Sequence, residues 1–255
     1  MRPQPRIFEV RGLRKAFFGL TVLDEVSLSV REGELLSIIG PNGSGKTTLF
    51  NVVSGFLPPD GGQVLYRGVD ITGKPAHDIA LRGIARTFQD VRLFGSLSAR
   101  ENLLMAAQQH QEEDFLGRFF WTRRIKGLEA AAAERAHELL ALIGLEDYAD
   151  FPAGRLSYGQ RKLLQFGVAI VADPELLLLD EPAAAVNPTM INAIKQRIVE
   201  FNRSGKTVLL IEHNMDVVMD ISHRVLVLDY GRLIAEGRPE EVRNDPQVLE
   251  AYFGR

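Results

Sequence analysis

A glycine-rich segment has the residue types that bind phosphate groups. Gly40-Pro-Asn-Gly-Ser-Gly-Lys46-Thr47 follows an apolar run and opens a helical stretch, which is the context in which a G-x-x-x-x-G-K-[ST] motif binds phosphates. Its glycines let successive N–H groups turn toward phosphate oxygens, and the following helix adds its positive end. Lys46 supplies a charge for the β- and γ-phosphates, and Thr47 a hydroxyl for Mg²⁺. We therefore predict binding of ATP with Mg²⁺ through Asn42, Gly43, Ser44, Gly45, Lys46, Thr47 and Thr48.

Two adjacent acids, Asp180 and Glu181, end another apolar run, in LLLLDEP. Ligands of open α/β sheets bind at the carboxyl ends of strands. There Asp180 would hold Mg²⁺ directly or through water, and Glu181 could polarise the attacking water as a general base. Alone, such a pair is more often structural, but the phosphate motif favours catalysis. His213 and Gln89 also end apolar segments. A lone histidine in such a position is more often structural than catalytic, and Gln89 by itself indicates little.

A second anion-binding surface is predicted at the start of a helix in LSYGQ. Ser157 and Gln160 have the spacing of a capping box, and so do Ser98 and Glu101. A cap alone would explain Ser157. Its hydroxyl, Gly159 and the N–H groups of the first turn also form a surface that can face phosphate.

The elements that must position these residues are readable from hydrophobic patterns. Residues 7–10 and the alternating Val26, Leu28 and Val30 predict antiparallel strands near the N-terminus. Near-continuous apolar runs predict strands covered on both faces of a mostly parallel sheet; they lie at 35–40, 176–180, 207–211 and 224–229. Helical stretches alternate with these runs, at 45–54, 188–203 and 214–221. The predicted class is therefore α/β.

The middle of the chain, roughly 90–170, lacks such strands and is predicted to be helical. Its alanine-rich stretch 128–143 strongly favours a helix that ends near Gly144. We expect one domain over residues 1–255, with 90–170 as an inserted helical subdomain.

Composition limits the classes of partner. The 255 residues carry a net charge of −3, so no whole-chain basic field exists to hold nucleic acid. The absence of cysteine excludes disulfides and thiolate metal sites. The first residues lead into no apolar stretch of signal-peptide length, and no run approaches the roughly 18 apolar residues of a membrane span. We expect a protein that is not exported and that meets a membrane only through another chain.

The motifs together, in their order along the chain, resemble the ATPase subunit of an ABC transporter. The resemblance covers essentially the whole chain and rests on GPNGSGKTT (40–48), Gln89, LSYGQ (156–160), LLLLDEP (176–182) and His213. It implies a P-loop NTPase core and two subunits that pair head to tail, with each ATP between the phosphate loop of one and the signature of the other.

The resemblance also implies roles for individual residues. Ser157, Gly159 and Gln160 would contact the γ-phosphate bound by the partner subunit. Gln89 would sense Mg²⁺ and the attacking water, so that Thr47, Gln89 and Asp180 form the metal set. The implied catalytic residues are Glu181, His213 (as the switch histidine), Gln89 and Lys46. Phe17 aligns with the aromatic residue that stacks on adenine, and Phe18 is the alternative.

A closer resemblance is to the uptake ATPases for branched-chain amino acids. It rests on ARTFQDVRLF (85–94), ENLLMA (101–106), DEPAAAVNP (180–188), IEHNMDVVM (211–219) and EAYFGR (250–255). It implies import powered at the cytoplasmic face of the inner membrane. The implied partners are a transmembrane permease, a second ATPase subunit that is a paralogue or a second copy, and indirectly a substrate-binding protein.

The permease contact is expected near Gln89–Phe94 and in the insertion 114–127. The aromatic residues of this insertion could equally build the core of the subdomain; they are Phe115, Phe119, Phe120 and Trp121.

The sequence departs from the family pattern at three places. Tyr158 replaces the first glycine of LSGGQ, Ala185-Val186 stand where Gly-Leu is usual, and Asn187 replaces an aspartate. These changes leave ATP binding intact and bear on the coupling between the two ATP sites.

Other functions remain open. A similar ATPase could serve urea or amide import, or export of a lipid or lipopolysaccharide. A soluble regulatory or nucleic-acid-associated ABC ATPase usually has two cassettes or long basic additions, which this chain lacks. A module that binds nucleotide without hydrolysis is disfavoured by Glu181 and His213.

Overall fold

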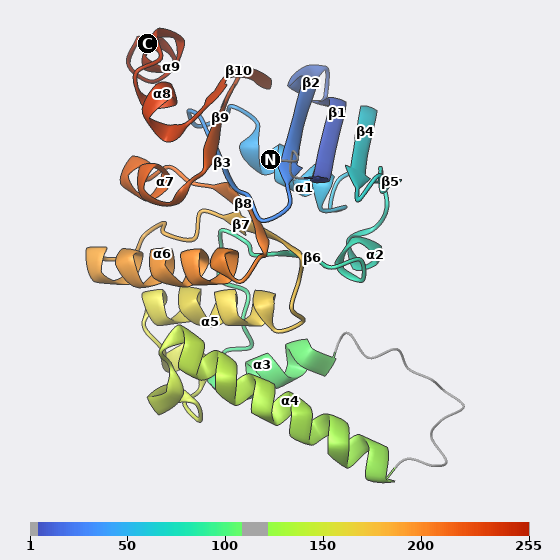
Figure 1. Ribbon diagram of the computed structural model, residues 1–255, viewed down its shortest axis with the longest axis vertical. Helices are drawn as coiled ribbons and strands as arrows, with labels where there is room; N and C mark the ends of the chain where they lie inside the picture. Colours follow the sequence, from blue (N-terminus) through green and yellow to red (C-terminus); the bar gives the residue numbers. More distant parts are fainter. Residues whose placement is uncertain (1–4, 109–121, 255) are drawn as a thin grey trace. The chain divides into compact units, whose positions relative to one another are not determined.

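The apolar runs of the sequence form the buried centre of a six-stranded sheet in the computed structural model, which describes residues 5–108 and 122–254. The sheet order is β10-β9-β3-β8-β7-β6 (Figure 1). The strands are β3 (Leu35–Ile39), β6 (Ile84–Arg86), β7 (Leu176–Asp180), β8 (Thr207–Ile211), β9 (Arg224–Asp229) and β10 (Arg232–Gly237). All pair in parallel except β10, which is antiparallel to β9. The predicted parallel sheet is confirmed, whereas the half-exposed β10 was not predicted.

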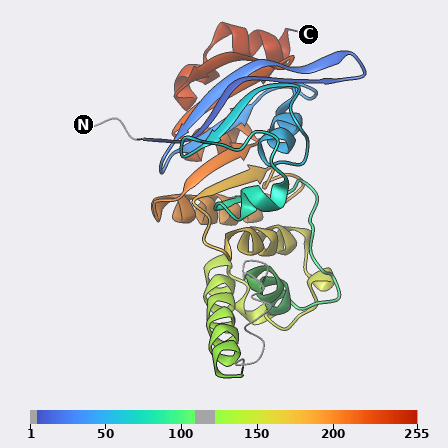
Figure 2. The ribbon, with the colours of Figure 1, turned by 90° about the vertical axis from the view of Figure 1, so that its right-hand side faces the viewer.

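A separate antiparallel sheet contains the N-terminal strands (Figure 2). Its order is β2-β1-β4-β5. The strands are β1 (Arg6–Phe17), β2 (Leu20–Arg31), β4 (Gly61–Tyr66) and β5 (Val69–Asp70). On β2 the alternating Val26, Leu28 and Val30 are buried, as their spacing predicted. The period of two places these side chains on one face of the sheet.

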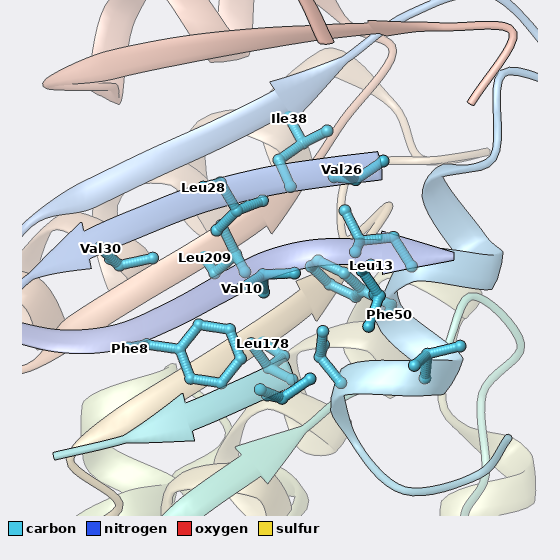
Figure 3. Packing of buried hydrophobic residues seen from close by; sticks show 14 of the residues in the cluster. Phe8, Val10, Leu13, Val26, Leu28, Val30, Ile38, Phe50, Leu178 and Leu209 are labelled. Carbon is cyan, nitrogen blue, oxygen red and sulfur yellow. The ribbon is translucent and has the colours of Figure 1, made fainter. Parts of the chain in front are cut away.

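The central strands of the six-stranded sheet are buried on both faces because alternate residues join different hydrophobic clusters. Ile38 belongs to the cluster that also contains Val26 and Leu28 of the antiparallel sheet and Phe50 of α1 (Figure 3). The next residue, Ile39, belongs to a second cluster, with Val218 of α7 and Val242 of α8. The helices around these clusters are α1 (Lys46–Val53), α7 (Met215–Ile221), α8 (Pro239–Arg243) and α9 (Pro246–Phe253). This packing explains the near-continuous apolar runs.

The described chain divides into two compact units. The core unit contains the described residues up to Gln89, Glu175–Ala185 and the described residues from Ile191 onward, and both sheets belong to it. The helical unit contains the described residues of Asp90–Pro174 together with Val186–Met190.

Helices α3, α4 and α5 pack on one another in the helical unit, drawn green to yellow in Figures 1 and 2. Their bounds are α3 (Ala99–Gln108), α4 (Thr122–Ile143) and α5 (Tyr158–Ile170), and 3₁₀ turns lie at Glu146–Tyr148 and Ala153–Arg155. The two other helices of the described chain are α2 (Ala76–Ala80) and α6 (Pro188–Arg203). Gly144, with φ of 69°, follows the last residue of α4, as the sequence predicted. The helix begins at Thr122, earlier than the alanine-rich stretch. Within the described ranges, no helix combines the length and apolar character needed to cross a bilayer.

Candidate functional site

The phosphate loop joins β3 to α1, and its shape requires glycine. Gly40, Gly43 and Gly45 have φ values of 152°, 80° and 106°. A Cβ on Gly40 would lie 2.0 Å from the carbonyl oxygen of Leu228, and one on Gly45 would lie 2.7 Å from that of Val22. The loop is thus pressed against neighbouring backbone, and α1 begins immediately after it.

Lys46, the first residue of α1, is only 5% exposed. Its Nζ donates to the carbonyl oxygens of Gly40 (2.9 Å) and Pro41 (2.8 Å) and to Oγ of Ser44 (3.2 Å). Burial lowers the pKa of Lys46, while the nearby carboxylates of Glu181 and Asp180 raise it. The loop therefore holds an ammonium group at its centre.

The other predicted residues of the loop differ in exposure. Ser44 is buried, Thr48 is half-buried, and Asn42, Gly43 and Thr47 are exposed.

Glu181 lies between two other predicted site residues. Nε2 of Gln89 donates to Oε2 of Glu181 at 2.8 Å, and Nε2 of His213 lies 2.7 Å from Oε1. The three residues follow β6, β7 and β8, whose carboxyl ends share one edge of the sheet. Glu181 has φ of 48°, a conformation that costs energy in a non-glycine residue and is concentrated at functional sites.

Asp180, at the end of β7, is 2% exposed and paired with a residue that sequence reasoning missed. Its Oδ2 accepts from Nη2 of Arg86 at 2.9 Å. Its backbone N–H donates to Oγ1 of Thr87 at 3.2 Å. Arg86 and Thr87 could have been found from their position in the sequence, because they lie just before Gln89, which was predicted to be part of the site.

Glu212 is a second residue that the sequence reasoning missed. It is 2% exposed, and its Oε1 accepts from the backbone N–H of Ala183 at 2.8 Å. Its Oε2 accepts from the N–H groups of His213 (2.8 Å) and Asn214 (3.0 Å). One carboxylate therefore joins the turn after Glu181 to the turn that carries His213. Glu212 could have been found from its position in the sequence, because it lies directly between an apolar strand and the predicted His213.

The signature segment starts α5 in the helical unit, and its predicted capping box is confirmed. Oγ of Ser157 accepts from the N–H of Gln160 (3.3 Å), and the N–H of Ser157 donates to Oε1 of Gln160 (2.9 Å). Gly159 is buried, and a Cβ there would lie 2.7 Å from the side chain of Met190. The ring of Tyr158 lies beside the cationic groups of Arg161 and Lys162.

The box at Ser98 and Glu101 is confirmed as well, by two reciprocal hydrogen bonds in the same unit.

The other two departures from the family pattern have different consequences. Ala185 has φ of 59°, where the usual glycine would adopt this conformation at lower cost. Asn187 accepts from the N–H of Met190 through Oδ1 at 2.9 Å and so caps the first turn of α6. Asparagine and aspartate cap helices about equally well, so this substitution preserves the cap.

Both candidates for adenine stacking lie at the turn between β1 and β2. Phe17 is 36% exposed, and Nζ of Lys15 lies 5.5 Å from its ring centroid. Phe18 is fully exposed and has φ of 50°.

Comparison with known proteins finds two family matches and close relatives over nearly the whole chain. The ABC transporter family matches residues 23–184, and the family of branched-chain amino acid ATP-binding cassette transporters matches residues 232–255. The chain is 43% identical over 249 residues to the high-affinity branched-chain amino acid transport ATP-binding protein BraF of Pseudomonas aeruginosa, covering 97% of this chain and 98% of BraF. It is 41% identical over 249 residues to LivG of Escherichia coli K12, with the same coverage.

Solved structures agree with this placement. The chain is 35% identical to an ATP-binding cassette of an ABC transporter in its ADP conformation, with a TM-score of 0.85 over 99% of this chain and 100% of that one. It is 25% identical to a dimeric cassette in a post-hydrolysis state with ADP and phosphate, with a TM-score of 0.77 over 91% and 98% of the two chains. The chain therefore belongs to the ABC transporter family, within its group of branched-chain amino acid ATP-binding proteins.

Proposed function

We propose that this chain is the ATP-binding and ATP-hydrolysing subunit of an ABC importer of branched-chain amino acids. The observation that carries the proposal is the position of Glu181, hydrogen-bonded to Gln89 and 2.7 Å from the imidazole of His213. The names of the relatives BraF and LivG support branched-chain amino acids as the cargo.

The phosphate loop would bind ATP through its backbone and Lys46. The three oxygens that Lys46 contacts are neutral acceptors. Phosphate oxygens are anionic and form stronger, charge-assisted hydrogen bonds. Bound ATP would therefore draw the ammonium toward the β- and γ-phosphates, with Asn42, Gly43, Ser44, Gly45, Thr47 and Thr48 around them.

The donor set beside the loop fits Mg²⁺. Thr47 offers a hydroxyl oxygen, Asp180 a carboxylate and Gln89 an amide oxygen, all hard oxygen ligands. Mg²⁺ is usually held by one or two carboxylates together with substrate phosphates. When bound, it would neutralise charge on the phosphates during transfer.

Glu181 would act as the general base of hydrolysis. A carboxylate has about four lone-pair sites, so a water can bind Glu181 alongside Gln89 and His213. Glu181 would accept the proton as the water attacks the γ-phosphate in line, while Lys46 stabilises the charge that spreads over the phosphoryl oxygens. His213 and Gln89 would keep the carboxylate oriented.

Two subunits would close head to tail on two ATP molecules. Ser157, Gly159 and Gln160 of each subunit would face the γ-phosphate bound by the other. The similar cassette that forms a dimer with ADP and phosphate supports this assembly. A homologous second ATPase or a second copy of this chain would be the partner.

The permease would dock near Gln89–Phe94. The ring of Phe94 is 56% exposed. Its backbone is held by the buried Asn102, whose Oδ1 accepts from the Phe94 N–H (2.9 Å) and whose Nδ2 donates to the Phe94 carbonyl (3.1 Å). Aromatic residues are enriched at protein–protein interfaces, so an exposed ring on a fixed backbone suits a protein contact.

The four aromatic residues of the predicted insertion lie outside the described residues, so docking there stays a prediction. The assembled protein would lie at the cytoplasmic face of the inner membrane, with a substrate-binding protein delivering cargo to the permease.

Co-purification from the native membrane tests the transport function. The tagged chain should recover a multi-span permease, and the complex in liposomes should hydrolyse ATP faster when leucine-loaded binding protein is present. Stimulation by urea, or recovery of a lipid exporter, would contradict branched-chain amino acids as the cargo and would leave the ATPase assignment intact. Recovery of only soluble or nucleic-acid-bound partners would contradict transport.

Replacing Phe17 by alanine should weaken ATP binding by about tenfold, because stacking of a base on an aromatic ring contributes about 1–3 kcal/mol. Equilibrium titration with a fluorescent ATP analogue measures the change. Phe18→Ala is the matched control and should bind ATP as the wild type does. The reverse result would assign adenine stacking to Phe18.

A further inference from the structure

The guanidinium group of Arg86 joins three structural elements of the core unit. Its side chain is 6% exposed. Nη2 donates to Oδ2 of Asp180 at 2.9 Å, and Nη1 donates to Oδ1 of Asn51 and Oγ of Ser54, both at 2.8 Å. Asn51 lies on α1 and Ser54 is its C-cap, so the same cation contacts the strand end that carries Asp180 and the helix that begins at Lys46.

Aromatic rings surround the same group. The centre of the guanidinium lies 5.0 Å from the ring centroid of Phe88 and 5.6 Å from those of Phe50 and Phe56. Phe56 and Phe88 also meet edge to face at 5.2 Å. Arginine suits such a site because its planar cation stacks on rings while its fork of N–H groups reaches several acceptors. Lysine could keep the charge but not all of these contacts.

Arg86 and the groups that it contacts lie next to each of the residues predicted to hold Mg²⁺. Phe88 directly precedes Gln89, Asp180 is bonded to Arg86, and Thr47 lies on the first turn of α1. The bond from Arg86 to Oδ2 of Asp180 fixes the orientation of this carboxylate at the end of β7. Residues that orient a metal ligand in this way commonly affect metal affinity as strongly as ligands do.

We propose that Arg86 is a positioning residue that preassembles the magnesium site of ATP by fixing Asp180 relative to α1. The inference rests on the proposed binding of ATP and Mg²⁺ at this site. The competing explanation is that Arg86 only neutralises a buried acid and stabilises the fold, without any influence on how Mg²⁺ strengthens nucleotide binding.

The test compares ATP affinity in Mg²⁺ with ATP affinity in EDTA, by equilibrium binding without turnover. For Arg86→Gln, the ratio of the two affinities should fall by about 10- to 100-fold relative to the wild type, the usual effect of losing a residue that orients a metal ligand. Affinity in EDTA should change less than about twofold, because the loop and Lys46 are untouched. Arg86→Lys should restore part of the ratio, since it keeps the charge.

Two further variants make the outcome decisive. Asn51→Ala keeps the ion pair with Asp180 but removes one anchor of Arg86 to α1, and it should lower the ratio by about threefold. Arg82→Gln, at an exposed arginine in the turn after α2, is the matched control and should leave the ratio unchanged.

If Arg86→Gln does not fold, Asn51→Ala decides the question. An unchanged ratio in the folded variants, with only a lower melting temperature, would overturn the proposal. Failure of the wild type to bind ATP in Mg²⁺ would instead overturn the proposed function on which this inference rests.

Discussion

Replacing Glu181 by glutamine will lower the rate of ATP hydrolysis by about 10²- to 10⁴-fold, the contribution typical of a positioned general base. Glutamine has nearly the same shape and still offers an amide oxygen, but it cannot accept the proton of the attacking water. ATP affinity should change little, since the phosphate loop and Lys46 are intact. Steady-state phosphate release and equilibrium ATP binding measure the two quantities separately.

The same variant should accumulate as an ATP-bound dimer, because closure no longer ends in hydrolysis. Size-exclusion chromatography with ATP and Mg²⁺ would show a larger species that is absent with ADP. Glu240→Gln, at an exposed carboxylate in the first turn of α8, is the matched control and should retain wild-type turnover. Unchanged turnover in Glu181→Gln would remove Glu181 from the role of base.

Replacing Glu212 by alanine will cause a large loss of stability. The carboxylate accepts three backbone N–H groups, from Ala183, His213 and Asn214. A hydrogen bond to a charged group contributes about 1.5–3 kcal/mol. Losing the set should therefore lower the free energy of unfolding by about 3 kcal/mol or more. At this chain length the melting temperature should fall by roughly 6–12 °C.

Thermal unfolding followed by circular dichroism measures this loss. Glu212→Gln should be intermediate, because the amide keeps one acceptor oxygen but turns an NH₂ group toward former donors. ATP turnover of both variants should fall, since the backbone of His213 loses its anchor beside Glu181. A melting temperature within about 1 °C of the wild type in Glu212→Ala would contradict the anchoring role.

Local patterns were sufficient to predict the phosphate loop and the class of fold. The loop is a contiguous segment whose function needs glycines at fixed positions and a lysine at the helix start, so its spacing is visible in the chain. The strands at 35–40 and 207–211 were visible because burial on both faces demands continuous apolar residues. The caps at Ser98 and Ser157 likewise depend on residues only three positions apart.

Contacts between distant segments were not visible. Arg86 meets Asn51 and Asp180 only because β6 lies beside β7 and the C-terminal end of α1 lies close by. The sequence around a single arginine after a short apolar segment does not predict which residues its side chain will contact. Glu212 similarly serves backbone groups on two different turns.

The sequence alone therefore determined which residues could bind phosphate, which runs had to be buried, and which family the chain resembles. Each of these properties is encoded in short segments or in hydrophobic periodicity. Tertiary structure alone decided that Glu181 meets both Gln89 and His213, and that Arg86 and Glu212 hold the surrounding turns. The reason is physical. The order of the parallel strands brings together loops that are far apart in the chain. A charged side chain buried there is stable only when it is paired or hydrogen-bonded, and the fold supplies those partners.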